Sequence, residues 1–391
     1  MSPSKHPMLA AMLVLIASAL CASGPIEQGR IERLVEQASG AKASQEWAAA
    51  EEVWREVLRT SPDHALASAE LRSLHEQGHV SIPIDEDAVG ALEAIVGNAF
   101  FRVETPWFIV LSDCDEVWTA ARAGVLERAA RQFRRMMDEL GLAWVPPERK
   151  LACVLFAEYE DFIAFARAHD DVKSSWVAGY YATGTNRAVF YDEATSPAVV
   201  RAASRLDEAD DRATRDASRE LNRARKELET HARETSISKT IHEAVHMLAF
   251  NCGLQRRSRS YPFWFTEGLA SSFETPDPRN AFGPSKTQDT VDRSLAQTAR
   301  DAALFEMGDL ISVTNPAGID SGRAAVLYAQ SNSFFRYLYR FEREELASYA
   351  RALWHAEPRD LSGAEHAELF KEHLGDEAKL GRRWLKRYVE R

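Results

Sequence analysis

The spacing of hydrophobic residues divides the chain into a helical first part and a mixed second part. From residue 27 to residue 78, hydrophobic residues recur every three or four positions, which is the period of an amphipathic helix. From residue 100 onward, short runs of β-branched and aromatic residues alternate with helical stretches. The pattern therefore predicts a group of helices followed by a domain that contains a sheet.

In the helical part, Ser61-Pro62-Asp63 separates a helix around Trp47 and Trp54 from a second helix over residues 65–74. A helix, a Pro-Asp turn and another helix resemble one tetratricopeptide unit. A solenoid needs at least three such units, and the sequence shows one. We therefore expect a helical hairpin that packs on the rest of the chain, within a segment of residues 25–80.

The mixed part opens with alternating strands and helices. The strongest hairpin signal is residues 176–191, where two β-rich runs flank the turn residues 183–186. Residues 207–236 carry charges of alternating sign, which favours an exposed helix stabilised by i,i+4 ion pairs. The remaining predictions are strands over Phe101–Leu111 and Leu151–Phe156 and helices over Val117–Leu140, Tyr159–Ala168 and Ala324–Arg340.

The segment HEAVH carries the first chemical motif. His242 and His246 are four residues apart, so on a helix they share one face and can reach one tetrahedral zinc ion. Glu243 points about 100° away from His242 around the helix, where it can take a proton from a water molecule. Gly253 is suited to end this helix. The alternative is a salt-bridged helix face, but burying these polar groups without a metal would be costly.

A second motif supplies a third ligand. Glu267 follows in the segment WFTEGLASS, and two histidines with one glutamate are a common ligand set for a catalytic zinc. A loop of about 15 residues would let a second helix return Glu267 to the metal. The alternative is that Glu267 is an ordinary solvent-facing helix carboxylate.

Together the two motifs resemble the gluzincin metallopeptidases of the MA-like group, including bacterial domains of unknown function. The resemblance is close over residues 240–275, in HEAVHMLAFNCGL and PFWFTEGLA, and loose over residues 100–345. It implies zinc ligands at His242, His246 and Glu267, and Glu243 as general base. No G-x-M-E-N segment is present, which disfavours an aminopeptidase.

The resemblance also implies three features around the zinc. The hairpin of residues 176–191 would form a sheet edge to which an extended peptide adds; the alternative is an edge without a ligand. Tyr328 would stabilise the oxyanion; the alternative is a packed core tyrosine. Ser271 stands where thermolysin-like enzymes have an aspartate that supports a histidine ligand, so Ser271 would give weaker support.

Composition narrows the class of protein. With 45% hydrophobic and 27% charged residues, the chain is globular, and 391 residues can hold two to three domains. A net charge of −11 argues against a nucleic-acid partner. Beyond Cys21, the cysteines are Cys114, Cys153 and Cys252, either with one disulfide such as Cys114–Cys153 or as free thiols.

The first 24 residues predict a secretory signal. Residues 8–20 form an apolar run that is too short to span a bilayer comfortably, and small-residue cleavage sites follow. We therefore expect a secreted or periplasmic protein without stable membrane insertion once the leader is removed. Cys21 allows lipid anchoring, but Leu20 is not the small residue expected before a lipidated cysteine.

The sequence thus predicts an α+β fold. A zincin-like domain of residues 98–345 combines a mixed sheet, the HExxH helix and a mainly helical C-terminal lobe. C-terminal helices over residues 346–391, the last of them basic, pack on this domain. The predicted function is hydrolysis of a peptide or protein substrate by a metal-activated water, as an endopeptidase with one Zn²⁺ per chain. The alternatives are an inactive or weakly active peptide-binding scaffold and a hydrolase of non-peptide amides. Substrate specificity and oligomeric state stay open.

Overall fold

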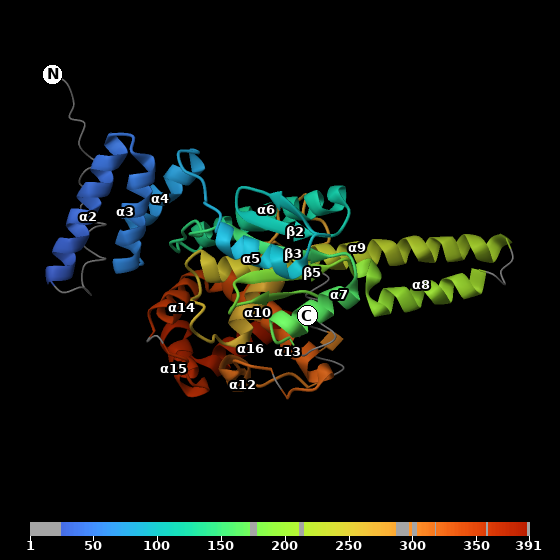
Figure 1. The fold of residues 1–391 in the computed structure, drawn as a ribbon. Coiled ribbons are helices and arrows are strands. Elements are labelled where there is room, and N and C mark those ends of the chain that lie inside the picture. The colour runs from blue at the N-terminus through green and yellow to red at the C-terminus, as the bar shows by residue number, and fades with distance from the viewer. Residues whose placement is uncertain are drawn as a thin grey trace, which may run out of the picture. The chain divides into compact units, whose positions relative to one another are not determined.

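The computed structural model describes residues 25–172, 178–210, 215–286, 297–298, 303–316, 318–356 and 359–388. The expected leader, with Cys21, lies outside the described residues. The chain divides into two compact units, Met1–Ile82 with Ala143–Pro146 and Pro83–Leu142 with Pro147–Arg391. The structure confirms an α+β fold, with N-terminal helices, a five-stranded mixed sheet and a helical C-terminal part (Figure 1).

In the part that the structure describes, the smaller unit contains the helices α2 (Pro25–Ala43), α3 (Trp47–Thr60) and α4 (Ala65–Glu76). The expected hairpin around Pro62 is α3 and α4, and α2 packs along α3. Burial of apolar side chains stabilises this unit. Its core comprises Ile31, Ala38, Ala50, Trp54, Val57, Ala67, Leu71 and Leu74.

The sheet of the larger unit has the strand order β1-β2-β3-β5-β4. The strands are β1 (Phe101–Glu104), β2 (Phe108–Ser112), β3 (Leu151–Phe156), β4 (Tyr180–Ala182) and β5 (Arg187–Tyr191). The pairs β2–β3 and β3–β5 are parallel, whereas both outer pairs are antiparallel. Helices α5 (Glu86–Val96) and α7 (Tyr159–His169) pack on one face of the sheet. The parallel strands are therefore buried and nearly continuously hydrophobic.

Two sequence expectations about the sheet meet different outcomes. The single strand expected over Phe101–Leu111 is wrong: Thr105-Pro106 turns the chain, and two antiparallel strands result. The hairpin expected over residues 176–191 is confirmed as β4 and β5 around residues 183–186, and β4 forms an edge of the sheet. Trp176 and Val177 lie outside the described residues.

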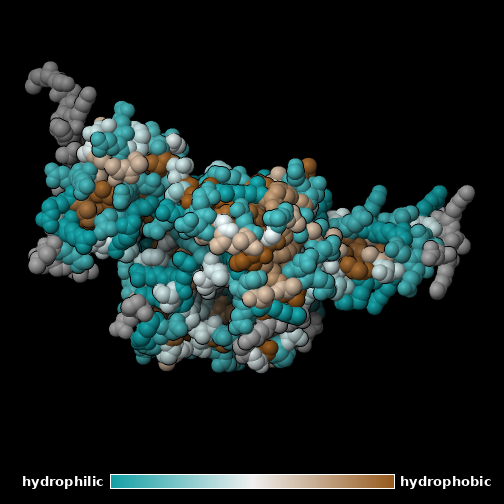
Figure 2. Space-filling view, in the orientation of Figure 1, coloured by the Kyte–Doolittle hydropathy of each residue, from teal (hydrophilic) through white to brown (hydrophobic). Residues whose placement is uncertain are grey.

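The HExxH motif lies on α9 (Arg215–Asn251), a helix of 37 residues. The first half of α9 runs beside α8 (Pro197–Asp210), which follows the short helix η1 (Glu193–Thr195), and the pair extends from the sheet (Figure 1). On the face seen in Figure 2, the α8–α9 pair is mostly hydrophilic, with hydrophobic residues gathered in a patch. Arg223 and Glu227 form an i,i+4 ion pair, as the charge pattern predicts. The second half of α9 packs against β4, β5 and α6 (Glu116–Glu139).

The helical C-terminal part closes the larger unit around α13 (Ser321–Phe341). Trp384 is buried and its indole Nε1 donates to Ser333 Oγ at 3.0 Å, so the basic C-terminal helix docks on α13. Among the described residues, none of the helices is long and apolar enough to cross a membrane. Further helices of the described residues are α10 (Phe263–Ser271), α12 (Met307–Ser312), α14 (Arg343–His355), α15 (Gly363–Leu374) and α16 (Glu377–Tyr388).

Candidate metal centre

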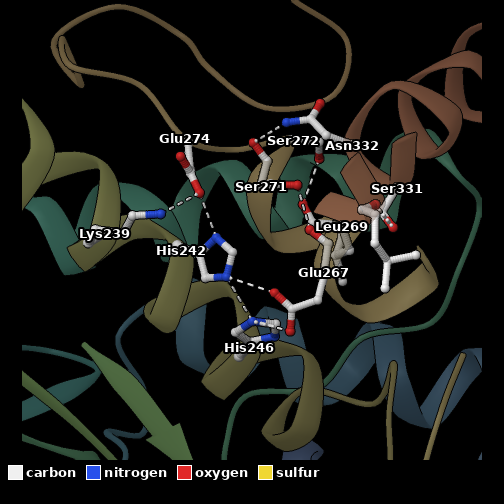
Figure 3. A network of polar contacts seen from close by, with 11 residues as sticks. Lys239, His242, His246, Glu267, Leu269, Ser271, Ser272, Glu274, Ser331 and Asn332 are labelled. Carbon is white, nitrogen blue, oxygen red and sulfur yellow. Dashed lines mark hydrogen bonds and ion pairs between the residues drawn. The ribbon is translucent and has the colours of Figure 1, made fainter. Parts of the chain in front are cut away.

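The structure brings His242, His246 and Glu267 together between α9 and α10 (Figure 3). His242 Nε2 lies 3.1 Å from His246 Nε2 and 3.1 Å from Glu267 Oε2. His246 Nε2 lies 3.4 Å from Glu267 Oε1. Ligands about 2.0–2.1 Å from a tetrahedral zinc ion are about 3.3 Å from one another, so these spacings match a zinc site.

The chemistry of the donor atoms also calls for a cation. His242 Nδ1 lies 2.7 Å from Glu274 Oε1, and an ionised carboxylate can only accept, so this nitrogen carries the proton. With a metal ion bound, the ring would be neutral and the lone pair of Nε2 would be available to the ion. Two imidazole nitrogens and a carboxylate that converge while nearly buried need a positive charge between them. The residues present therefore fit a metal ion.

Electrostatics at this centre favour positive charge. Burial opposes ionisation of the His242 imidazole, but hydrogen bonds to Glu267 and Glu274 raise its pKa to about 10. Burial likewise opposes ionisation of Glu267, yet the two histidines hold the pKa of its carboxyl well below its usual range. The sequence alternative of a solvent-facing Glu267 is therefore wrong, because its side chain is only 18% exposed and lies against both rings.

Glu274 is a residue that the sequence reasoning missed. Its Oε1 accepts from His242 Nδ1, and Lys239 Nζ, one turn earlier on α9, lies 3.3 Å from the same oxygen. Burial works against the charge of Glu274, but contacts with His242 and Lys239 lower the pKa of its carboxyl. The arrangement fixes the tautomer and orientation of the His242 ring. An acidic residue immediately after the Glu267 helix is the only sequence signal for it.

Ser271 does not have the role that the family pattern suggests. Its hydroxyl donates to the backbone carbonyl of Glu267 at 2.5 Å, within α10. This is the common i−4 bond of a helical serine, and it directs the hydroxyl along the helix instead of toward a histidine. The expectation that Ser271 supports a histidine ligand is therefore wrong, and Glu274 occupies that role.

Glu243 lies on α9 beside the start of the edge strand. An ideal Cβ at Gly179 would be 3.4 Å from Glu243 Cγ and 3.2 Å from the Phe190 ring. The backbone just before β4 thus approaches Glu243 closely, which the absence of a side chain at Gly179 permits. The start of the edge strand therefore lies next to Glu243.

Tyr328 lies on α13 and is 39% exposed, so the alternative of a core tyrosine is wrong. Its ring packs edge-to-face on Phe263 at 4.9 Å between centroids. Burial of the phenol, together with the negative charges of Glu267 and Glu243, raises the pKa of Tyr328. The hydroxyl is therefore protonated at neutral pH and able to donate a hydrogen bond near these carboxylates.

The described cysteines Cys114, Cys153 and Cys252 are free thiols. Burial raises the pKa of the Cys114 thiol to about 11, so it is a poor nucleophile. Of the two sequence possibilities, the structure shows free thiols. They lie apart from the histidine and glutamate donors and add nothing to the metal centre.

Comparison with known proteins finds that part of the chain, with the candidate metal centre, is similar to a family model of unknown function. Residues 236–360 match the model of the family described as Protein of unknown function (DUF1570). The matched segment contains both motifs of the metal centre and Tyr328, but none of the strands. A search of curated proteins finds no match to this chain. The three donors thus form a group that could hold a metal ion in zincin-like geometry.

Proposed function

We propose that this chain hydrolyses peptide bonds with a zinc ion held by His242, His246 and Glu267. The observation that carries the proposal is the convergence of three donor atoms at 3.1–3.4 Å from one another, with no fourth protein ligand in the group among the described residues. A bound zinc ion would supply Lewis acidity, lowering the pKa of a water toward 7 and polarising a carbonyl. Structural zinc sites instead fill all four positions with protein ligands.

Glu243 supplies the general base of the proposed reaction. It follows His242 in sequence but points elsewhere around α9, so its carboxylate is free to take a proton from the attacking water. The same carboxyl then donates that proton to the leaving nitrogen, which returns Glu243 to its starting state. The Tyr328 hydroxyl donates to the oxygen that becomes negative.

A peptide is the substrate that the surroundings favour. The edge strand β4 begins beside Glu243, and an extended peptide can pair with an exposed strand through backbone hydrogen bonds. The leader expected in residues 1–24 would direct this activity outside the cytoplasm.

Metal analysis and a cleavage assay of Glu243→Gln test the proposal. We expect one zinc per chain in the parent and in the variant, but a loss of about 10²- to 10⁴-fold in cleavage of unfolded casein in the variant. Glu229→Gln, the same change on the exposed part of α9, should cleave like the parent. Absence of zinc in the parent, or full activity of Glu243→Gln, would contradict the proposed mechanism. Zinc and peptide binding without turnover in the parent would support the peptide-binding scaffold instead.

A further inference from the structure

The position of the edge strand is not secured by the sheet alone. Strand β4 has three residues and pairs with β5 on one side. So short a strand is marginal without further contacts. Its first neighbour, Gly179, nevertheless lies against Glu243. The contacts that hold β4 in place therefore also determine the position of the backbone next to Glu243.

The turn of the β4–β5 hairpin is attached to the end of α9 by two asparagines. Asn186 Nδ2 donates to Asn251 Oδ1 at 3.0 Å, and Asn251 Nδ2 donates to Asn186 Oδ1 at 2.8 Å. Tyr181 adds a third bond, since its hydroxyl donates to Asn186 Oδ1 at 2.7 Å. Asn186 has a φ of +52°, a left-handed conformation that asparagine tolerates better than most residues. The Asn186–Asn251 pair is thus a specific contact.

The partner of this pair belongs to the helix that carries the metal centre. Asn251 is the last residue of α9, eight positions after Glu243, and its side chain also donates to the Met247 carbonyl at 2.8 Å. Eight residues of α-helix span about 12 Å along a rigid axis. Beside the pair, the rings of Tyr181 and Phe250 stack at 5.7 Å between centroids. The end of α9 therefore sets the place of the hairpin relative to Glu243.

A second anchor keeps the hairpin folded by other means. Arg187 donates to both carboxylate oxygens of Asp170 at 2.8 and 3.0 Å, and Tyr180 donates to the same carboxylate at 2.7 Å. The Asp170 side chain is fully buried. Loss of the Asn186–Asn251 pair would leave this anchor intact, so the hairpin would shift on α9 without unfolding.

We propose that Asn251 is a positioning residue, which through Asn186 holds the edge strand β4 in the register that presents a peptide to Glu243. The role in peptide binding rests on the proposed function. The attachment of the hairpin to α9 is a property of the protein without any ligand. Asn251 lies five residues after His246 in the sequence. The side-chain hydrogen bonds of the pair run between the two asparagines, to Tyr181 and to the Met247 carbonyl, not to the metal donors. The pair should govern how a peptide lies and leave metal binding unchanged.

Hydrogen exchange of the metal-free protein tests the attachment. In Asn251→Ala and in Asn186→Gly, the amides of residues 180–182 should exchange about tenfold faster, the effect of losing a hydrogen-bonded pair. Because the two variants break the same pair, the double variant should exchange no faster than either one. Thr183→Ala, in the exposed turn of the same hairpin, is the matched control and should exchange like the parent. Unchanged exchange in both single variants would overturn the proposal.

Two zinc-binding probes of different length test the positioning role. In the zinc-loaded protein, Asn251→Ala should bind N-acetyl-Leu-Ala-hydroxamate about tenfold more weakly than the parent, and acetohydroxamate within twofold. If both probes lost affinity equally, the effect would belong to the metal centre. If the longer probe lost no affinity, Asn251 would not position the edge strand for a peptide. Either result would overturn the proposal. If the parent binds no zinc, the proposed function fails, and the exchange measurement alone decides the attachment.

Discussion

At the residue scale, Glu274 is the carboxylate that orients His242 in the candidate metal centre. It accepts a hydrogen bond from His242 Nδ1 at 2.7 Å and reaches this ring from beyond the end of α10. We expect Glu274→Ala to weaken zinc binding about 10- to 100-fold, because the His242 ring loses the contact that fixes its orientation. Competition with a calibrated chelator measures this directly.

Ser271→Ala is the matched control for that experiment. Its hydroxyl bonds the Glu267 carbonyl within the helix, so its loss should leave zinc affinity within about twofold of the parent. A weaker site in Ser271→Ala together with a normal site in Glu274→Ala would reverse the roles that we assign to these two residues.

We expect Tyr328 to affect the rate of peptide cleavage and not the binding of zinc. Burial, together with the charges of Glu267 and Glu243, raises the pKa of the phenol, so it is protonated and can donate a hydrogen bond to an oxyanion. Tyr328→Phe keeps the ring packing on Phe263 but removes the donor, so kcat should fall about 100-fold while zinc content stays at the parental level. Tyr337→Phe, a buried tyrosine on the same helix, should retain parental kcat. If Tyr328→Phe kept the parental kcat, the Tyr328 hydroxyl would not be the group that stabilises the oxyanion.

At the scale of elements, the contact of α10 with α13 sets the position of the Glu267 backbone. An ideal Cβ at Gly268 would lie 2.4 Å from the Ser331 carbonyl oxygen and 2.8 Å from Phe335 Cβ, so any side chain forces the helices apart. We expect Gly268→Ala to lower the free energy of unfolding by about 1–3 kcal/mol and to weaken zinc binding as Glu267 moves. Urea denaturation and zinc titration measure the two effects.

Gly90→Ala provides the control for helical glycines. It lies on an exposed face of α5 where an added Cβ meets nothing, so the substitution should be neutral or stabilise by up to about 1 kcal/mol. If Gly268→Ala were as stable as Gly90→Ala, the two helices would have room to separate and their close approach would not constrain the site.

The elements also show which parts of the molecule can be read from sequence. His242 and His246 follow from a spacing of four, because helical geometry fixes their relation locally. Glu274 meets His242 only through the turn after α10, and no periodicity specifies that turn. The break at Thr105-Pro106 escapes the pattern because aromatic and β-branched residues lie on both sides of it, so residues 101–111 look like one strand. Local patterns thus predict elements and spacing, while contacts between distant elements need the fold.

At the scale of the whole molecule, the metal donors and the N-terminal helices belong to different compact units. The smaller unit has its own hydrophobic core, built from α2, α3 and α4. A ligand stabilises only the cooperative unit that binds it, and a free concentration 100-fold above Kd contributes about 2.7 kcal/mol. Metal binding should therefore stabilise the larger unit selectively.

Chelation followed by hydrogen exchange tests this prediction. Removing zinc should increase exchange in α9, α10 and α13 about 100-fold, while exchange in α2, α3 and α4 stays unchanged, because no metal donor belongs to the smaller unit. His246→Ala should show the faster exchange of the larger unit whether or not zinc is added. Equal acceleration in both units would mean that they unfold as one, and no change in either would mean that His242, His246 and Glu267 hold no metal that matters for stability.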